Sequence, residues 1–298
     1  MSTVPPPARR LPPWLPPARA VDEFVLATVL LFLAVTAVRW LRDPGSALCV
    51  AGPGAAITVI GAFSGTVLTV LVLTPAGRRS GGHMNPAVTV SLWLMGAFPG
   101  RGVLPYVLAQ LAGSAAGTGL ARLAWGRPVT LPPVDYAAIG PAPAWQPSAV
   151  FLAEAGSMAA IVLVVGFLLA RTRLAHLLPY AVGLSVALVI TLLGTRSGGS
   201  VNPARQFGPA VLAGRTEDLW IYLVAPVLGA ALGAWLDRVV GRRRPRPAGA
   251  TRTAAGSAGP PCGEDTLAVK GRAAPRVPAR TAVPTPSVHH GNASERKD

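Results

Sequence analysis

Two asparagine side chains are the groups in this sequence best placed to do hydrogen-bond chemistry. They open the tripeptides Asn85-Pro86-Ala87 and Asn202-Pro203-Ala204, and each tripeptide stands two residues after Ser-Gly-Gly. An asparagine at this place caps a helix, and a proline fits the first helical position because its missing N–H would have no partner there. Each copy therefore predicts an irregular segment that turns into a short helix.

The chemistry of these segments depends on where they lie. A helix N-terminus carries roughly +0.5 charge and points free N–H groups forward, and irregular backbone at membrane depth is tolerated only where it is buried in protein or lines a watery cavity. If both short helices begin at the middle of a membrane, they bring two amide donors and a positive potential to one point of a pore. The alternative is a pair of ordinary asparagine-capped turns in unrelated loops. The repetition of the whole pattern, each time after an apolar run, favours the pore.

The composition indicates a membrane protein. Of the 298 residues, 51% are hydrophobic and 13% are charged, whereas soluble domains carry about 25% charged residues. The formal net charge of +15 could suggest a nucleic-acid partner. However, the basic residues gather in the C-terminal tail and beside apolar segments, so we predict no nucleic-acid binding.

Apolar segments of a length suited to cross about 30 Å of hydrocarbon recur along the chain. They cover residues 21–41, 54–73, 103–125, 148–170, 177–193 and 219–240. The short helices after the two asparagines, which should end near residues 96 and 213, are too short to cross. The chain thus divides into two repeats of three spans and one half-helix, over residues 21–125 and 148–240. Because three is odd, the second repeat inserts inverted, and the site is expected near the midplane, between the repeats.

The expected fold is therefore an all-α membrane domain over residues 21–240, with six transmembrane helices and two re-entrant half-helices in two inverted repeats. Residues 1–20 are rich in proline and arginine and should form an irregular cytoplasmic arm. Residues 241–298 are basic with few large apolar side chains and should be a disordered cytoplasmic tail. The distribution of arginines beside the spans favours both termini inside the cell.

Catalytic and metal-binding patterns are not found in the sequence. The chain has four histidines and no Cys-x-x-Cys pair, no phosphate-binding loop and no nucleophile beside a base, so we expect no enzyme activity, no metal and no cofactor. Cys49 and Cys262 fall on opposite sides of the predicted membrane and should not form a disulfide.

Each repeat opens with an acidic residue just inside an apolar segment, Glu23 in the first and Glu154 in the second. A carboxylate inside a bilayer is expensive and is usually buried with a partner. The alternative places both acids at the membrane interface, where they would cap helix starts.

The two asparagine motifs, together with Arg205 directly after the second, resemble the signature loops of the aquaporin family, also called the major intrinsic proteins. The resemblance covers roughly residues 20–240 and suggests a bacterial aquaporin. It implies a right-handed helix bundle that assembles as a homotetramer in the cell membrane and conducts water while excluding protons and ions. It also implies that Glu23 and Glu154 brace the backbone of the signature loops.

A water pore must replace hydrogen bonds without offering a proton wire. Backbone carbonyls of the extended loop residues would form a ladder of acceptors, here at Gly81, Gly82, His83, Gly198 and Ser200. The Asn85 and Asn202 amides would donate to one central water molecule, and the half-helix dipoles would oppose cations and protons.

The resemblance further implies a narrow outer constriction, the filter, formed here by Phe63, Ile190, Gly199 and Arg205. Phe63 takes its place only if residues 74–79 contain an insertion; otherwise Gly65 takes it. Strict water channels typically have a histidine where Ile190 stands, and Gly199 adds no side-chain bulk. The sequence therefore predicts a wide, half-apolar filter, suited to water and to small uncharged solutes such as glycerol.

Other functions fit the sequence less well. A secondary transporter also uses inverted repeats and broken helices, but its coupling-ion site would need carboxylates that face the substrate, and Glu23 and Glu154 lie outside the signature loops. A membrane enzyme would need clustered catalytic residues, and a sealed junction protein would need bulk where Gly199 stands. Within the channel class, the alternative is a glycerol facilitator with little selectivity for water.

Residues 241–298 should be dispensable for conduction, because their composition predicts no packed structure that could line a pore. We expect a chain that ends at Arg244 to show the same water permeability per inserted channel as the full chain in proteoliposomes. Basic residues beyond the last span can still hold anionic lipid, at about 1 kcal/mol each, so the lipid composition must be matched. A shortened chain that inserts normally but does not conduct would contradict the prediction.

Overall fold

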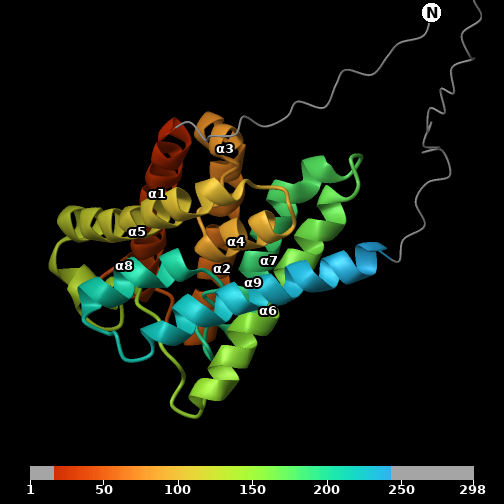
Figure 1. Ribbon diagram of the computed structural model, residues 1–298. Helices are drawn as coiled ribbons and strands as arrows, with labels where there is room; N and C mark the ends of the chain where they lie inside the picture. The colour runs from red at the N-terminus through yellow and green to blue at the C-terminus, as the bar shows by residue number, and fades with distance from the viewer. Residues whose placement is uncertain (1–16, 243–298) are drawn as a thin grey trace, which may run out of the picture. The chain divides into compact units, whose positions relative to one another are not determined.

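The structure is a computed structural model that describes residues 17–242, almost all of them in helices and short connecting loops (Figure 1). The longer helices are α1 (Pro17–Arg42), α2 (Pro53–Leu73), α3 (Pro75–Ser80), α4 (Pro86–Leu94), α5 (Val103–Trp125), α6 (Pro147–Leu169), α7 (Leu178–Leu193), α8 (Pro203–Ala213) and α9 (Leu219–Arg242). Single turns of 3-10 helix are η1 (Gly100–Gly102), η2 (Arg127–Thr130), η3 (Asp135–Ala137) and η4 (Ala175–Leu177).

The predicted N-terminal arm and C-terminal tail lie mostly outside the described residues. At the few positions where a predicted terminal segment overlaps with the described residues, the structure differs from the prediction. Residues 17–20 already belong to α1, and α9 continues to Arg242. The structure therefore extends the first and last spans by a few residues beyond the ends read from hydropathy.

Six helices in the described part are long and apolar enough to cross a membrane, which confirms the predicted all-α fold with six spans. They are α1, α2, α5, α6, α7 and α9. Proline stands in the first turn of α2 and α6, where its fixed φ favours the helix and no N–H is needed.

The helix α3 lies between the span over residues 54–73 and the first asparagine motif, where hydropathy predicts no helix. The Thr74 side chain caps this helix by accepting a hydrogen bond from the backbone N–H of Gly77 at 3.1 Å. The helix ends at Gly81, which has φ +99° and so adopts the left-handed conformation that suits a helix C-terminus. This extra turn of helix leads directly into the first asparagine motif.

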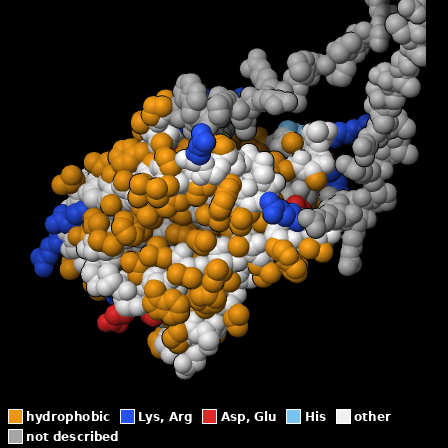
Figure 2. All heavy atoms as spheres, viewed as in Figure 1, with side chains coloured by type: hydrophobic (Ala, Val, Ile, Leu, Met, Phe, Trp, Pro, Cys, Tyr) orange, Lys and Arg blue, Asp and Glu red, His pale blue; other side chains and the backbone are white. Residues whose placement is uncertain are grey.

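The outer surface of the described helices is apolar. Large side chains such as Leu123 (81% exposed) and Leu152 (70% exposed) point away from the protein, and hydrophobic side chains cover most of the face in Figure 2. Soluble monomers rarely expose contiguous apolar patches above a few hundred Å². This surface is therefore suited to lipid, in agreement with the six membrane-length helices.

Glycines let the long helices approach closely. On α5, an added Cβ at Gly113 would lie 2.5 Å from the carbonyl oxygen of Phe24, and one at Gly117 would collide with that of Thr28 on α1. The second repeat has an equivalent close crossing, because an added Cβ at Gly229 of α9 would overlap a backbone carbonyl of α6. Small residues at such positions allow tight crossings inside a membrane.

The half-helices α4 and α8 tie the two repeats together. The first repeat comprises α1, α2, α4 and α5, and the second comprises α6, α7, α8 and α9. The half-helix of each repeat packs on the last long helix of the other, α4 on α9 and α8 on α5. The Ser114 hydroxyl of α5 accepts a hydrogen bond from the backbone N–H of Gly208 in α8 at 2.9 Å and donates one to the carbonyl of Ala204.

The close crossing of α1 and α5 yields a prediction on stability. Gly117→Ala should destabilise the protein by about 1–3 kcal/mol, because its new methyl group overlaps a backbone carbonyl that cannot move aside freely. Gly119→Ala is the matched control on the same helix, since the nearest atom to its Cβ is 4.0 Å away. The unfolding temperature in detergent should fall for the first variant and not for the second. Equal unfolding temperatures for the two variants would refute this account of the crossing.

Candidate functional site

Inside the protein, each of the two predicted asparagine caps bonds to the loop that precedes the other. Asn85 Oδ1 accepts a hydrogen bond from Ala87 N at 2.9 Å, and its Nδ2 donates to the carbonyl of Val201 at 3.0 Å. Asn202 makes the equivalent contacts, with its Oδ1 accepting from Ala204 N at 2.9 Å and its Nδ2 donating to the carbonyl of Met84 at 3.0 Å. The motifs therefore begin two helices and also fasten the two loops to each other.

The backbone before each asparagine is in the left-handed region. Positive φ values occur at Gly81 (99°), Gly82 (59°), Met84 (48°), Gly198 (97°), Gly199 (60°) and Val201 (44°). Glycine adopts this conformation readily, but for a β-branched residue such as Val201 it is an outlier. Strain of this kind persists only where the surroundings hold it, and it clusters at functional sites.

Glu23 holds the first of these loops. Its Oε1 accepts hydrogen bonds from the Ser80 hydroxyl at 2.7 Å and from His83 N at 2.9 Å. Its Oε2 accepts from Met84 N at 2.7 Å and from the Gln110 side-chain amide at 2.8 Å. The carboxylate is fully buried, so the alternative of an acid at the membrane interface does not describe its position.

Glu154 holds the second loop in the same way. Its Oε1 accepts from the Ser197 hydroxyl at 2.9 Å and from Ser200 N at 3.1 Å, and its Oε2 accepts from Val201 N at 2.7 Å. This side chain is also fully buried. In both repeats, the acid predicted to brace the loop contacts the backbone N–H groups that directly precede the asparagine.

Further polar residues support both loops and were not identified from the sequence. The Tyr106 hydroxyl donates to the carbonyl of Ser80 at 2.7 Å, and the Tyr222 hydroxyl donates to that of Ser197 at 2.6 Å. Each tyrosine lies near the start of the last long helix of its repeat. Their matching places in the two repeats are the signal in the sequence that could have found them.

His83 lies beside the first loop and contacts polar and aromatic groups. Its Nδ1 is 3.1 Å from the Thr89 hydroxyl oxygen, and its ring packs edge-on against Phe98 at 4.8 Å between centroids. These contacts favour a packing role for His83 over a gating role. In the described part of the chain no group of three or more His, Cys, Asp or Glu side chains could hold a metal.

A cavity of about 270 Å³ lies between the repeats, lined by α1, α2, α6 and α7, both asparagine motifs and residues 133–140. Asn85, Asn202, Arg205 and Ile190 all line it, so the structure brings these predicted residues together. Within the described residues, the charged side chains that line it are those of Arg42 and Arg205. The cavity is therefore mainly apolar, with a few hydrogen-bonding groups and positive charge.

Of the predicted acceptor ladder, His83, Gly198 and Ser200 line the cavity, whereas Gly81 and Gly82 do not. Gly199 does not line it either. An added Cβ at Gly199 would lie 2.9 Å from the carbonyl oxygen of Val189, so this glycine allows the loop to pack against α7. The prediction that Gly199 widens the filter by lacking a side chain is thus not supported by its position.

The prediction for α2 needs a similar correction. The residues of α2 that line the cavity are Ile57, Ile60, Ser64 and Leu68, which lie at helical spacing on one face. Phe63 is off that face and 39% exposed. Gly65 is buried, and an added Cβ there would overlap the Gly183 carbonyl oxygen of α7. Neither Phe63 nor Gly65 is therefore among the residues that line the cavity.

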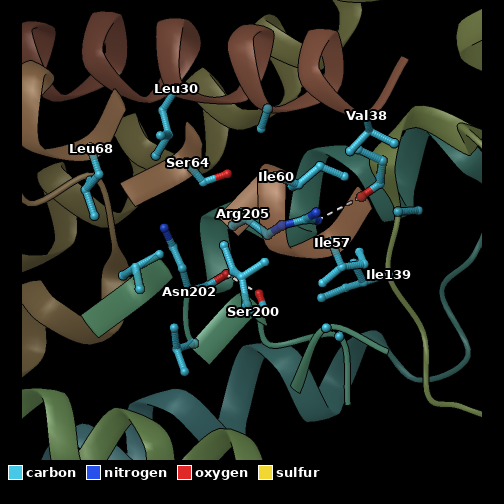
Figure 3. A pocket seen from close by; sticks show the side chains of 18 of the residues that line it. Leu30, Val38, Ile57, Ile60, Ser64, Leu68, Ile139, Ser200, Asn202 and Arg205 are labelled. Carbon is cyan, nitrogen blue, oxygen red and sulfur yellow. Dashed lines mark hydrogen bonds between the residues drawn. The ribbon is translucent and has the colours of Figure 1, made fainter. Parts of the chain in front are cut away.

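The Arg205 guanidinium lies in the same part of the cavity as isoleucines from α2 and from the 133–140 loop. Ile57, Ile60 and Ile139 point into this part of the cavity (Figure 3). Arg205 Nη1 donates to the carbonyl of Ala137 at 2.8 Å and contacts Gln206 Oε1 at 3.4 Å. A fixed guanidinium thus faces an aliphatic wall.

Comparison with known proteins gives consistent results. A family model described as major intrinsic protein matches residues 17–237. The probable aquaporin AqpM of Archaeoglobus fulgidus is 38% identical over 173 residues, which cover 55% of this chain and 69% of the relative. Aquaporin NIP1-3 of Oryza sativa is 34% identical over 223 residues, covering 74% and 73%. Nodulin-26 of Glycine max is 37% identical over 177 residues, covering 59% and 63%.

Among solved structures, the X-ray structure of the aquaglyceroporin from Plasmodium falciparum has a TM-score of 0.66, covering 75% of this chain and 96% of that one. At 21% identity it supports the fold alone. Six membrane-length helices, two half-helices that meet through their caps and a cavity between the repeats define a membrane channel. The family match shows that this chain belongs to the major intrinsic proteins, which are channels and not enzymes. The bacterial origin suggested by the sequence stays a prediction.

The carboxylate of Glu154 should be needed for a stable channel. In Glu154→Gln an amide N–H₂ replaces one carboxylate oxygen and faces a backbone or hydroxyl donor. Leaving such a buried donor unpaired costs about 1–3 kcal/mol. We expect a lower unfolding temperature in detergent and lower water permeability per protein. The control is Glu217→Gln, because Glu217 is exposed between α8 and α9. If the two variants behave alike, Glu154 does not brace the loop.

Proposed function

We propose that this protein is a passive transmembrane channel that conducts water, admits small uncharged solutes such as glycerol, and excludes protons and ions. The observation that carries the proposal is the convergence of Asn85, Asn202 and Arg205 on one cavity. Each asparagine amide uses one hydrogen to hold the opposite loop. A second hydrogen on each nitrogen remains available to a molecule in the cavity.

Proton exclusion follows from this arrangement. A water molecule that accepts from both amides points its own hydrogens away from the centre, so a continuous chain of donors and acceptors is interrupted. The N-termini of α4 and α8 begin at the same asparagines and add a positive potential. Positive half-helix ends and a fixed arginine are recognised barriers to cations and protons in such pores.

The aliphatic wall supports passage of small solutes besides water. Ile57, Ile60 and Ile190 line the cavity and offer no hydrogen bonds, whereas Arg205 donates on another side. A polyol could place its CH groups on the isoleucines while its hydroxyl groups accept from Arg205. The same wall favours the second candidate, a glycerol facilitator with little selectivity for water.

The secondary-transporter hypothesis is disfavoured by the two acids. Glu23 and Glu154 are fully buried, hydrogen-bonded within the protein and not among the residues that line the cavity. They are therefore not exposed to a substrate or to a coupling ion.

We also propose that the protein is a homotetramer in the cell membrane with both termini in the cytoplasm. The tetramer rests on membership of the family alone. The orientation rests on arginines, which gather in the loops and ends on the proposed inner side at Arg78, Arg79, Arg101, Arg171 and Arg173. One of them, Arg79, forms a bidentate ion pair with Asp22 that raises the pKa of the guanidinium.

Ile190→His tests the filter. The histidine ring reaches further from the backbone than isoleucine does, and it adds a donor or acceptor to the cavity that also holds Arg205, so it should lower glycerol permeability more than water permeability. A change of about tenfold in the ratio is what one pocket group supplies. The measurement is stopped-flow swelling of proteoliposomes in paired water and glycerol gradients, with Ile190→Val as the conservative control. Asn202→Leu should lose water permeability, and it serves as the reference for a channel that is blocked at its centre. A wild type that passes only water, or an unchanged ratio, would exclude the solute-admitting filter.

A further inference from the structure

Ile139 enters the cavity from a loop and not from a helix. It follows the single turn η3 and lines the cavity beside Arg205 (Figure 3). An added Cβ at Gly198 would lie 2.8 Å from Ile139 Cδ1, so the isoleucine rests directly on the second asparagine motif. Behind it lies a buried apolar cluster that includes Ile221 and Tyr222. The side chain is therefore held in place on two sides.

Gln206 fixes the backbone of Ile139 through both of its polar groups. Its Oε1 accepts from Ile139 N at 3.2 Å, and its Nε2 donates to the carbonyl of Ile139 at 2.7 Å. The Gln206 side chain is 1% exposed. A carboxylate at this position could accept the first bond but could not donate the second. The amide is therefore the group that this contact requires.

The turn before Ile139 is strained and is held by further contacts. Asp135, Tyr136 and Ala137 have φ values of 42°, 55° and 59°, which cost energy for residues other than glycine. Asp135 forms an ion pair with Arg215 at 2.5 Å, and the carbonyl of Ala137 accepts from Arg205. A turn with this conformation persists only because its surroundings hold it.

We propose that Ile139 is an additional wall of the filter that sets the size limit for uncharged solutes, and that Gln206 is the residue that positions it. The proposal rests on the channel function proposed above. It assigns the size limit jointly to α2, α7 and this loop, since Ile60, Ile190 and Ile139 line the cavity that also holds Arg205. Removing one aliphatic wall enlarges the passage without removing the donor.

The test compares wild type with Ile139→Ala, Gln206→Met and the double variant in proteoliposomes. Permeabilities to water, glycerol and xylitol, a longer polyol, are measured on the same samples. We expect Ile139→Ala to raise the ratio of xylitol to water permeability about tenfold. Gln206→Met should change the ratio in the same direction, because it releases the loop. The double variant should add little to the larger single effect, since both act through one contact.

Leu131→Ala is the matched control, because Leu131 is an exposed aliphatic residue in the same connection between α5 and α6 and does not line the cavity. The ratio of xylitol to water permeability of Leu131→Ala should equal that of wild type. Ile139→Phe gives an independent test in the opposite direction, and should lower glycerol relative to water permeability even if the alanine variant folds poorly.

Two kinds of failure can be told apart. If wild type conducts water but Ile139→Ala and Ile139→Phe leave all ratios unchanged, the loop is not a wall of the filter and the channel function stands. A change with Leu131→Ala as large as that with Ile139→Ala would also overturn the proposal, because it would trace the effect to the loop as a whole. If wild-type liposomes take up water no faster than empty ones, the channel function itself fails.

Discussion

The structure depends on keeping two non-helical backbone segments bonded inside a membrane-spanning fold. An unbonded backbone polar group in hydrocarbon costs several kcal/mol, and the loops before the two asparagines leave consecutive N–H groups without helical partners. Glu23 and Glu154 accept those N–H groups at 2.7–3.1 Å. Hydrogen bonds to an ionised carboxylate are roughly twice as strong as neutral ones, so two buried acids make the irregular segments tolerable.

The same bonds connect the acids to the centre of the cavity. Glu23 holds Met84 by its N–H in a left-handed conformation, and the carbonyl of Met84 accepts from Asn202 of the other repeat. In the second repeat, Glu154 likewise accepts from Val201 N, and the carbonyl of Val201 accepts from Asn85 of the first repeat. Each acid thereby determines the position of the asparagine that belongs to the opposite repeat. The two loops therefore hold each other in place through these hydrogen bonds.

Hydropathy and the repeated motif predicted the spans and the half-helices, because length, apolarity and duplication are properties of the sequence itself. The bracing role of Glu23 and Glu154 was implied only by the resemblance to the family. The face of α2 could not be predicted in this way. Its residues are apolar or small on every side, so nothing in the sequence distinguishes the face of Ile60 from that of Phe63. The role of Gly199 is not readable from the sequence, because a glycine is suited both to a wide passage and to a close backbone contact such as the one with Val189. The hydrogen bonds by which Arg205 and Gln206 hold residues 137–139 go to backbone groups, which carry no residue-specific signal.

Arg205 is held by the same strained loop. Both oxygens that accept its hydrogen bonds, the carbonyl of Ala137 and Oε1 of Gln206, are uncharged. A carboxylate in their place would hold the guanidinium equally well, but it would cancel much of the field, because opposite charges in contact interact strongly where water is scarce. A neutral carbonyl fixes the position and leaves the charge to act on the cavity. The backbone that presents this carbonyl is left-handed at residues 135–137, at a cost of order 1–3 kcal/mol per residue. The strain in the loop is thus coupled to the positive potential that separates uncharged solutes from cations.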